Sequence, residues 1–228
     1  MEYFKKLLLF SCFVVLLLFN LQAIAAPLNL GSTGDTNYTK TSEIVLTEAK
    51  ENLSKFLNYI PDGYESFYGF NSRDDFKDAQ VTAPIQIYTL SLDFLSSDLS
   101  KFTDYILPTN DWKIPVVVNG SAKSFLQVTK FNNSFKAVDL GGAVLASEIF
   151  DQLKFYNEKN DIYLFRLYQI ASDLLLIVPK DKGISSAIVL PLNSAYRIRE
   201  ELSLQQNTTT DLNSLAPVLK KIYKTPFK

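Results

Sequence analysis

Apolar residues recur at helical spacing in several stretches of the chain. After Ser42, a predicted N-cap, they return every three or four residues until Pro61 ends the pattern. A second such stretch follows Gly141-Gly142 and places Leu145, Ile149 and Leu153 on one face. The spacing predicts helices at residues 42–60, 143–156, 194–204 and 214–223, with short helices capped by Ser72 and running from Asp98 to Ile106.

Between these helices the pattern changes to that of strands. The predicted strands are Ile85–Leu90, a hairpin over Trp112–Phe131, Phe135–Leu140, Ile162–Ile170, Leu174–Val178 and Ser185–Leu190. The hairpin turns at Asn119-Gly120, a pair that accepts the positive φ of a type I′ turn. Leu174–Val178 has no polar alternation, which predicts a central strand covered on both faces.

The hairpin also predicts which residues share a face. Counting outward from its turn places the following on one face: Trp112, Ile114, Val116, Val118, Ser121, Lys123 and Phe125. Pro115 has no backbone N–H to donate, so its strand is expected to be an edge strand or to carry a bulge.

The order of helix, strands, helix, strands and helix predicts an α+β fold, with an antiparallel β-meander sheet packed with several helices. A doubly wound parallel sheet is the less favoured alternative, because long parallel crossovers are scarce. The predicted divisions of the chain are a signal peptide (1–25), a flexible leader (26–41), an α+β globular domain (42–205) and a C-terminal linker and helix (206–228).

The first 25 residues have the order of a secretory signal peptide. Lys5 and Lys6 precede an almost wholly apolar run, Leu7–Leu21, and Ala23-Ile24-Ala25 supplies small residues for cleavage. The expected location is therefore periplasmic or extracellular. An uncleaved anchor is the alternative, and it is the one route by which we expect this chain to contact a membrane.

Cleavage there would change what chemistry is available. It would remove Cys12, the single cysteine, and since the sequence has no histidine, the remaining chain would contain neither residue. A Ser-His-Asp triad, a Cys-His dyad and a zinc site of the usual kind are thereby excluded. With Lys5, Lys6 and Glu2 gone, the net charge is −2, which excludes a nucleic-acid protein with a broad basic face. No metal or other cofactor is predicted.

Six residues are candidates for binding. Four form an aromatic cluster after the turn at Pro61: Tyr64, Phe67, Tyr68 and Phe70. Exposed clustered aromatics mark recognition sites, although core packing explains the same residues. Trp112 lies on the strand proposed as an edge. Arg166 lies in an apolar strand, where it requires a local carboxylate, a solvated face or an anionic ligand.

Two further features have simpler structural explanations. Asp74, Asp75 and Asp78 could act as acid and base or bind Ca²⁺, but acidic residues also stabilise the first turn of a helix. Gly141-Gly142 could cradle a phosphate at a helix N-terminus, but the pair also fits a tight turn.

The sequence thus predicts an exported, non-catalytic domain that binds a peptide, a protein or a small ligand. Two routes are open: β-augmentation on the strand near Trp112–Val118, or a pocket between the curved sheet and its helix. The alternatives are a carboxylate-dependent hydrolase of extracellular polymers and a structural component of an envelope complex.

Overall fold

The computed structural model describes residues 36–156 and 159–225. The helices are α2 (Thr36–Asn58), α3 (Ala143–Leu153), α4 (Tyr196–Glu201) and α5 (Leu212–Lys224). The strands are β1 (Gln80–Val81), β2 (Ile85–Leu90), β3 (Ile106–Val118), β4 (Ser121–Phe131), β5 (Ser134–Gly141), β6 (Asn160–Leu167), β7 (Ser172–Pro179), β8 (Ile188–Pro191) and β9 (Thr210–Asp211). The predicted signal peptide and residues 26–35 of the predicted leader lie outside the described residues.

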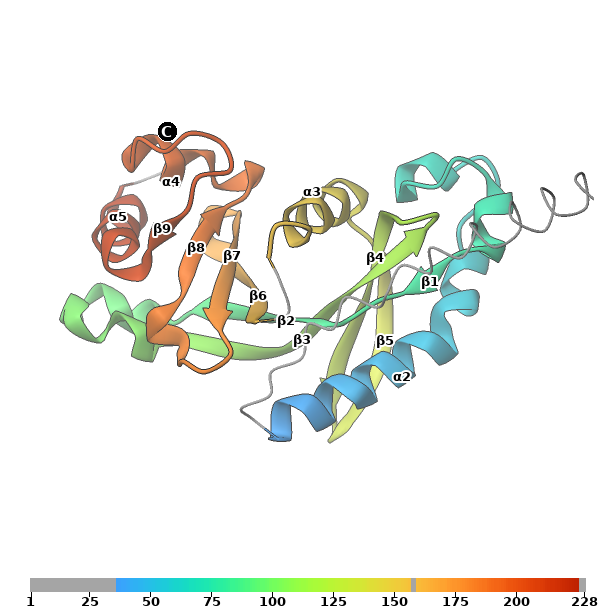
Figure 1. Ribbon diagram of the computed structural model, residues 1–228, viewed down its shortest axis with the longest axis horizontal. Coiled ribbons are helices and arrows are strands. Elements are labelled where there is room, and N and C mark those ends of the chain that lie inside the picture. The colour runs from blue at the N-terminus through green and yellow to red at the C-terminus, as the bar shows by residue number, and fades with distance from the viewer. Residues whose placement is uncertain (1–35, 157–158, 226–228) are drawn as a thin grey trace, which may run out of the picture.

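The nine strands of the described residues belong to one sheet. Its order is β5-β4-β3-β2-β6-β7-β8-β9, and β1 pairs with β3 beside β2 (Figure 1). Among the described strands, β2 and β6 form a parallel pair and every other pairing is antiparallel. The chain therefore has the predicted α+β fold, with a large, mostly antiparallel sheet.

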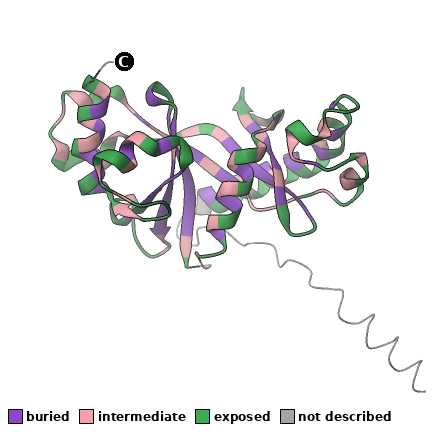
Figure 2. Cartoon of the chain, turned by 90° about the horizontal axis from the view of Figure 1, so that it is seen from above, coloured by how far each residue is buried: buried purple, intermediate pink, exposed green. Residues whose placement is uncertain are grey.

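The sheet is buried on both faces by different helices. One face packs against the apolar sides of α2, α4 and α5, together with two 3₁₀ segments, Leu92–Leu95 and Leu99–Tyr105. The other face packs against the apolar side of α3. Figure 1 shows α3 over the middle of the sheet, opposite α2, and Figure 2 shows that much of the buried chain is in the strands. Among the described residues no helix is long and apolar enough to span a bilayer.

The predicted burial of Leu174–Val178 on both faces is confirmed. These residues form most of β7, which lies between β6 and β8. Leu174 and Leu176 belong to the core that α2, α4 and α5 cover, and Leu175 and Ile177 to the core beneath α3. Successive side chains of a strand point to opposite faces of the sheet, so β7 can contribute to both cores only because its side chains on both faces are apolar.

The prediction that Phe125 shares a face with Trp112 is wrong, because β4 contains a bulge. Val117 pairs with Ala122 but Val116 pairs with Ser124, so Lys123 is an additional residue in β4. An additional residue in one strand shifts the alternation of side chains, so the residues that follow it point to the opposite face from the one predicted. Phe125 consequently packs in the core beneath α3. Ser124 is fully buried, and its hydroxyl has no hydrogen-bond partner among the described residues.

The prediction of an edge strand around Pro115 is also wrong, since β3 lies inside the sheet. Pro115 lies at the break between two neighbours, because β1 pairs with β3 as far as Val116 and β2 pairs with it from Lys113. The carbonyl of Pro115 accepts the N–H of Thr82 at 3.0 Å, so the position of its absent N–H faces this break. The register shift one residue from Pro115 adds a residue to β4 and not to β3, while β3 has its own irregularity opposite β2, between Pro108 and Trp112. Among the described strands, β4 pairs with one side of Trp112–Val118 and β1 and β2 with the other, so this stretch offers no open edge for β-augmentation.

Two predicted boundaries also differ from the structure. The first helix begins at Thr36 rather than after Ser42, so residues 36–41 of the predicted leader are helical. At the other end, α5 buries Leu215, Leu219 and Ile222 in the core that α2 covers. The strand β9 also pairs with β8, so this segment packs as part of the same unit.

The loop after α2 meets the bulge of β4 through a glycine. Gly69 has a φ of +85°, and a Cβ at this position would lie 2.1 Å from the carbonyl oxygen of Lys123 and 3.1 Å from the Cβ of Ala143. This close approach holds the loop that carries Tyr64, Phe67, Tyr68 and Phe70, here called the aromatic loop, against both β4 and the start of α3. Gly63 has nearly the same φ, +83°, with no atom within 4 Å of an added Cβ.

Gly69→Ala is therefore expected to lower the free energy of unfolding more than Gly63→Ala does. Both variants force a left-handed alanine, which costs about 1–2 kcal/mol. Gly69→Ala adds a collision with backbone, and overpacking costs about a further 1–3 kcal/mol. Chemical denaturation of the two variants measures the difference. Equal losses in both variants would show that the contact with Lys123 is unimportant.

Candidate functional site

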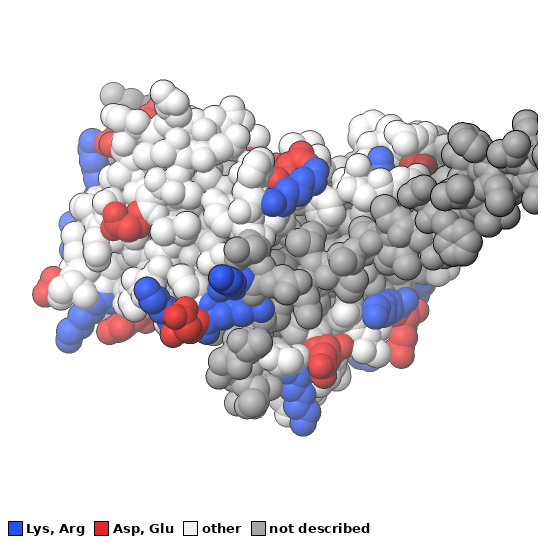
Figure 3. Space-filling model, in the orientation of Figure 1, with Lys and Arg blue, Asp and Glu red and all other residues white. Residues whose placement is uncertain are grey.

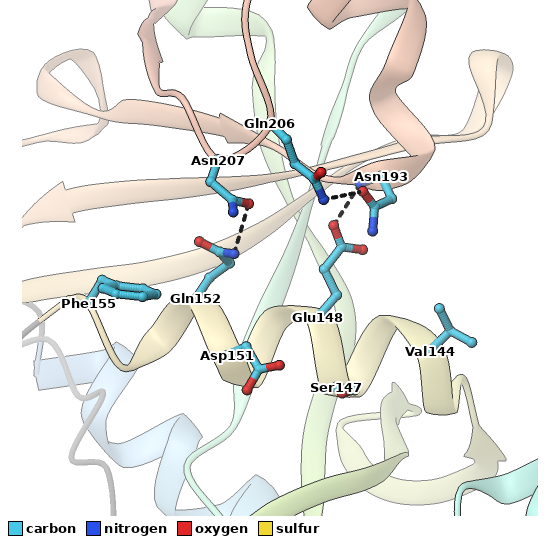
Figure 4. A pocket seen from close by; sticks show the side chains of 9 residues that line it. All are labelled: Val144, Ser147, Glu148, Asp151, Gln152, Phe155, Asn193, Gln206 and Asn207. Carbon is cyan, nitrogen blue, oxygen red and sulfur yellow. Dashed lines mark hydrogen bonds between the residues drawn. The ribbon is translucent and has the colours of Figure 1, made fainter.

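A groove lies between α3 and two segments from the far half of the sheet. Its volume is about 590 Å³, within the range of about 300–1,000 Å³ typical of small-molecule sites. One wall is α3, and the other combines the turn after β8 with the loop between α4 and β9 (Figure 4). The lining residues are Val144, Ser147, Glu148, Asp151, Gln152, Phe155, Asn193, Gln206 and Asn207.

Hydrogen bonds between side chains and backbone connect the two walls. The backbone N–H of Asn193 donates to Oε1 of Glu148 at 2.7 Å, and Nε2 of Gln152 donates to Oδ1 of Asn207 at 3.0 Å. Within the far wall, Nε2 of Gln206 donates to Oδ1 of Asn193 at 3.3 Å. Figure 4 shows these polar groups converging between the helix and the two loops. These hydrogen bonds tie the two walls of the groove to each other.

The amphipathic pattern of α3 explains how its polar residues reach the groove. Ala146, Ile149, Phe150 and Leu153 are buried beneath the helix. Residues three and four apart share a helix face, so Glu148, Asp151 and Gln152 project from the opposite side. The predicted helix and its polar side are both observed. The sequence did not indicate which loops that polar side would meet, so Gln152, Asn193, Gln206 and Asn207 were missed.

The groove is acidic and lacks basic side chains among its nine lining residues. Burial raises the pKa of the Glu148 carboxyl, while the hydrogen bond from Asn193 and the charge of Arg199 oppose that shift. Asp151 forms an exposed ion pair with Lys154, with 2.7 Å between Oδ1 and Nζ. Outside the groove, basic and acidic side chains are interspersed on the face drawn in Figure 3. Neither the acidic lining of the groove nor the mixed charge of the surrounding surface favours an anionic ligand.

Two apolar side chains mark the ends of the groove. Val144 lies in the first turn of α3 and Phe155 just beyond its last residue, and each is 80% exposed. The backbone N–H of Phe155 donates to the carbonyl of Gln152 at 3.0 Å, which fixes the turn carrying the ring. Phe155 therefore presents its ring beside the carboxamides.

The four predicted aromatic candidates separate into two pairs. Tyr64 and Phe67 are exposed, with ring centroids 5.5 Å apart, and Phe67 is 76% exposed. Phe70 is buried against Phe76, with ring centroids 5.1 Å apart, and Tyr68 is half-buried beside the same core. Core packing thus accounts for Phe70 and Tyr68, while recognition by the exposed Tyr64 and Phe67 stays a prediction.

Trp112 and Arg166 do not line the groove either. Trp112 is 2% exposed, and its ring lies 5.4 Å from that of Tyr38 inside the core. Arg166 on β6 faces its register partner Asp173 on β7, and its guanidinium donates to both carboxylate oxygens, at 2.7 and 3.1 Å. The requirement of Arg166 for a partner is therefore met by a local carboxylate.

A second polar cluster accompanies this pair on the α3 side of the sheet. Lys113 is buried, and its Nζ donates to Oε1 of its cross-strand partner Gln127 at 2.8 Å. Burial lowers the pKa of Lys113, and the charge of Arg166 adds to that effect. These groups satisfy one another, as buried polar groups in a sheet must.

The acidic cluster and the second hollow have structural explanations. Asp74 pairs with Lys77, and Asp75 accepts the N–H of Asn71 in the 3₁₀ segment that Ser72 caps, as predicted. Within the described residues no group of three acidic side chains could hold a metal. A hollow of about 390 Å³ between α2 and β5 contains Glu48. Glu48 accepts the N–H of Ala137 at 3.0 Å and thereby covers the edge strand β5.

Arg166→Ala is expected to lower the free energy of unfolding by about 1.5–3 kcal/mol, since the largely buried Asp173 loses two charge-assisted hydrogen bonds. The control is Lys77→Ala, which removes an exposed ion pair and should change stability little. Urea denaturation measures both variants. Similar losses in the two would mean that the Arg166–Asp173 pair behaves as an exposed one.

Glu148→Gln is expected to change how stability depends on pH. The folded protein favours the protonated carboxyl, since its pKa is raised above the ordinary 4.5. The stabilisation from Glu148 is therefore complete below that value and is lost as the pH rises through the folded pKa. Glutamine keeps an oxygen acceptor for Asn193, so the variant should gain stability relative to the native protein between pH 4 and 7. Unfolding free energies across this range test the sign, and a relative loss would contradict it.

Comparison with known proteins identifies no relative from which a role could be transferred. No protein-family model, no curated protein and no solved structure matches this chain. The functional conclusion therefore depends on the side chains that α3 and the two facing loops bring together in the groove.

Proposed function

We propose that this chain is an exported, non-catalytic binding domain and that the groove beside α3 binds its ligand. The observation that carries the proposal is the convergence of polar side chains from three separate segments on one concave site. Ligand sites are typically concave and contain a few well-placed polar groups. Export is inferred from the signal-peptide pattern of residues 1–25.

The sheet serves this function as a rigid support. We infer that β3, β4 and β5 act as a β-meander that positions the start of α3, since β5 leads directly into that helix. The opposite wall follows β8 at Asn193 and precedes β9 at Gln206 and Asn207. Both walls are thus attached to strands of one sheet, which favours a binding site that exists before its ligand arrives.

Hydrolysis by carboxylates is the second candidate. Glycoside hydrolysis requires one carboxylic acid with a raised pKa and a second carboxylate nearby. Glu148 has the raised pKa, and Asp151 lines the same groove. However, Glu148 accepts a backbone N–H and Asp151 is paired with Lys154, so both carboxylates already have structural partners. Binding without turnover is therefore favoured over hydrolysis.

A panel of neutral disaccharides, amino acids and capped tripeptides tests the proposal by NMR with isotope-labelled protein. We expect at least one compound to shift the backbone amide of Asn193 and the side-chain amides of Gln152 and Gln206. Shifts centred on Tyr64 and Phe67 would move the binding site to the aromatic loop. Conversion of a compound, lost in Glu148→Gln, would replace the proposal with hydrolysis.

Gln206→Ala is expected to weaken binding of the responding compound roughly two- to tenfold, the effect of one hydrogen bond. Gln205→Ala is the matched control, since it removes the neighbouring carboxamide, which does not line the groove. Titration calorimetry or NMR titration gives the affinities. Equal effects of the two substitutions would argue that the loop, rather than the Gln206 carboxamide, determines binding.

A further inference from the structure

We infer that the ligand of this groove is a neutral saccharide, with a sugar ring stacked on Phe155 and hydroxyls bonded to the carboxamides beside it. The inference rests on the proposed function and identifies its ligand class. It depends on the exposure of Phe155, on the hydrogen-bonding capacity left on Gln152 and Asn207, and on the charge of the groove.

The Phe155 ring is a large apolar surface placed next to polar groups. It is 80% exposed, whereas Phe150 on the helix that precedes it is buried; Phe67, which is also exposed, lies outside the groove. A sugar ring has one face of C–H groups and a rim of hydroxyls, so it matches an exposed aromatic ring flanked by hydrogen-bonding side chains. Covering the ring removes apolar area from water, which is favourable.

The carboxamides retain donors and acceptors after their contacts within the protein. Gln152 uses one N–H and Asn207 uses its oxygen in their mutual hydrogen bond. By the inventory of a carboxamide, Gln152 keeps its oxygen and one N–H, and Asn207 keeps both N–H groups. A hydroxyl both donates and accepts, so a ligand with several hydroxyls can use this mixed set. Asn207 is held in place by a left-handed backbone, with a φ of +62°.

Charge and backbone geometry disfavour the other ligand classes. The nine lining residues include no lysine or arginine to attract phosphates, uronic acids or peptide carboxylates. The charged groups among them are the carboxyls of Glu148 and of Asp151, and the second is paired with Lys154. In β-augmentation an extended peptide is captured by main-chain hydrogen bonds along a strand edge. Every residue lining the groove lies on α3, in a turn or in a loop, so the groove offers no strand to pair with.

The test uses maltose, cellobiose and N,N′-diacetylchitobiose as neutral probes, galacturonic acid as an anionic one and acetyl-trialanine amide as a peptide. Saturation-transfer NMR reports contact with the protein, and titration gives affinities. At least one disaccharide is expected to bind, with shifts at the amides of Gln152 and Asn207. Galacturonic acid and the peptide are expected to bind at least tenfold more weakly.

Substitutions at Phe155 separate stacking from simple apolar contact. Phe155→Leu should weaken the responding disaccharide roughly tenfold, since the aromatic face is lost, and Phe155→Trp should retain binding. Phe131→Ala, which removes an exposed ring at the β4–β5 turn, is the control and should have no effect. Full affinity in Phe155→Leu would overturn the role of the ring.

The outcomes also distinguish this inference from the proposed function. If the peptide binds in the groove with sensitivity to Gln206→Ala and no disaccharide binds, the groove is a binding site but its ligand is not a saccharide. If the disaccharides shift only residues outside the groove, both statements are overturned. Binding of galacturonic acid as tight as that of a neutral disaccharide would overturn the argument from charge.

Discussion

Burial of a single sheet on both of its faces is the constraint on which the rest of this structure depends. Strand β7 contributes apolar side chains to two cores, so neither face of its half of the sheet can be left to water. The helices must therefore divide between the faces, with α2, α4 and α5 on one and α3 on the other. A sheet of this kind gains its stability from apolar area removed from water by separate layers.

The groove is a consequence of that division. Helix α3 buries one side against the sheet and turns its polar side toward the segments that leave β8 and enter β9. Polar groups elsewhere near the sheet are matched closely, as Arg166 is with Asp173 and Lys113 with Gln127. In the groove, the hydrogen bonds among the carboxamides use only some of their donors and acceptors. The remaining donors and acceptors, next to an exposed phenylalanine, make this the place where a ligand would gain most.

Predictions that depend on contacts between residues near in sequence were more accurate than those that depend on contacts between distant residues. Helices, strands and the Asn119-Gly120 turn depend on neighbours a few residues apart, so the pattern of apolar residues located them. The bulge at Lys123 lies where Gly69 and the start of α3 approach β4, and Gly69 is distant from it in sequence. One additional residue was enough to move Phe125 to the opposite core. Pro115 was placed at an edge because no local signal shows that two short strands meet beside it.

The sequence by itself determined the α+β composition, the central position of Leu174–Val178, the two-sided character of α3 and the absence of histidine chemistry. These properties follow from residue types and their spacing. The tertiary structure alone decided that β3 is interior, that Trp112 is buried, and that Gln152, Asn193, Gln206 and Asn207 meet in one groove. The physical reason is that strand order and helix placement are set by burial across the whole sheet. Side chains from positions 152 and 207 become neighbours only when that sheet has formed.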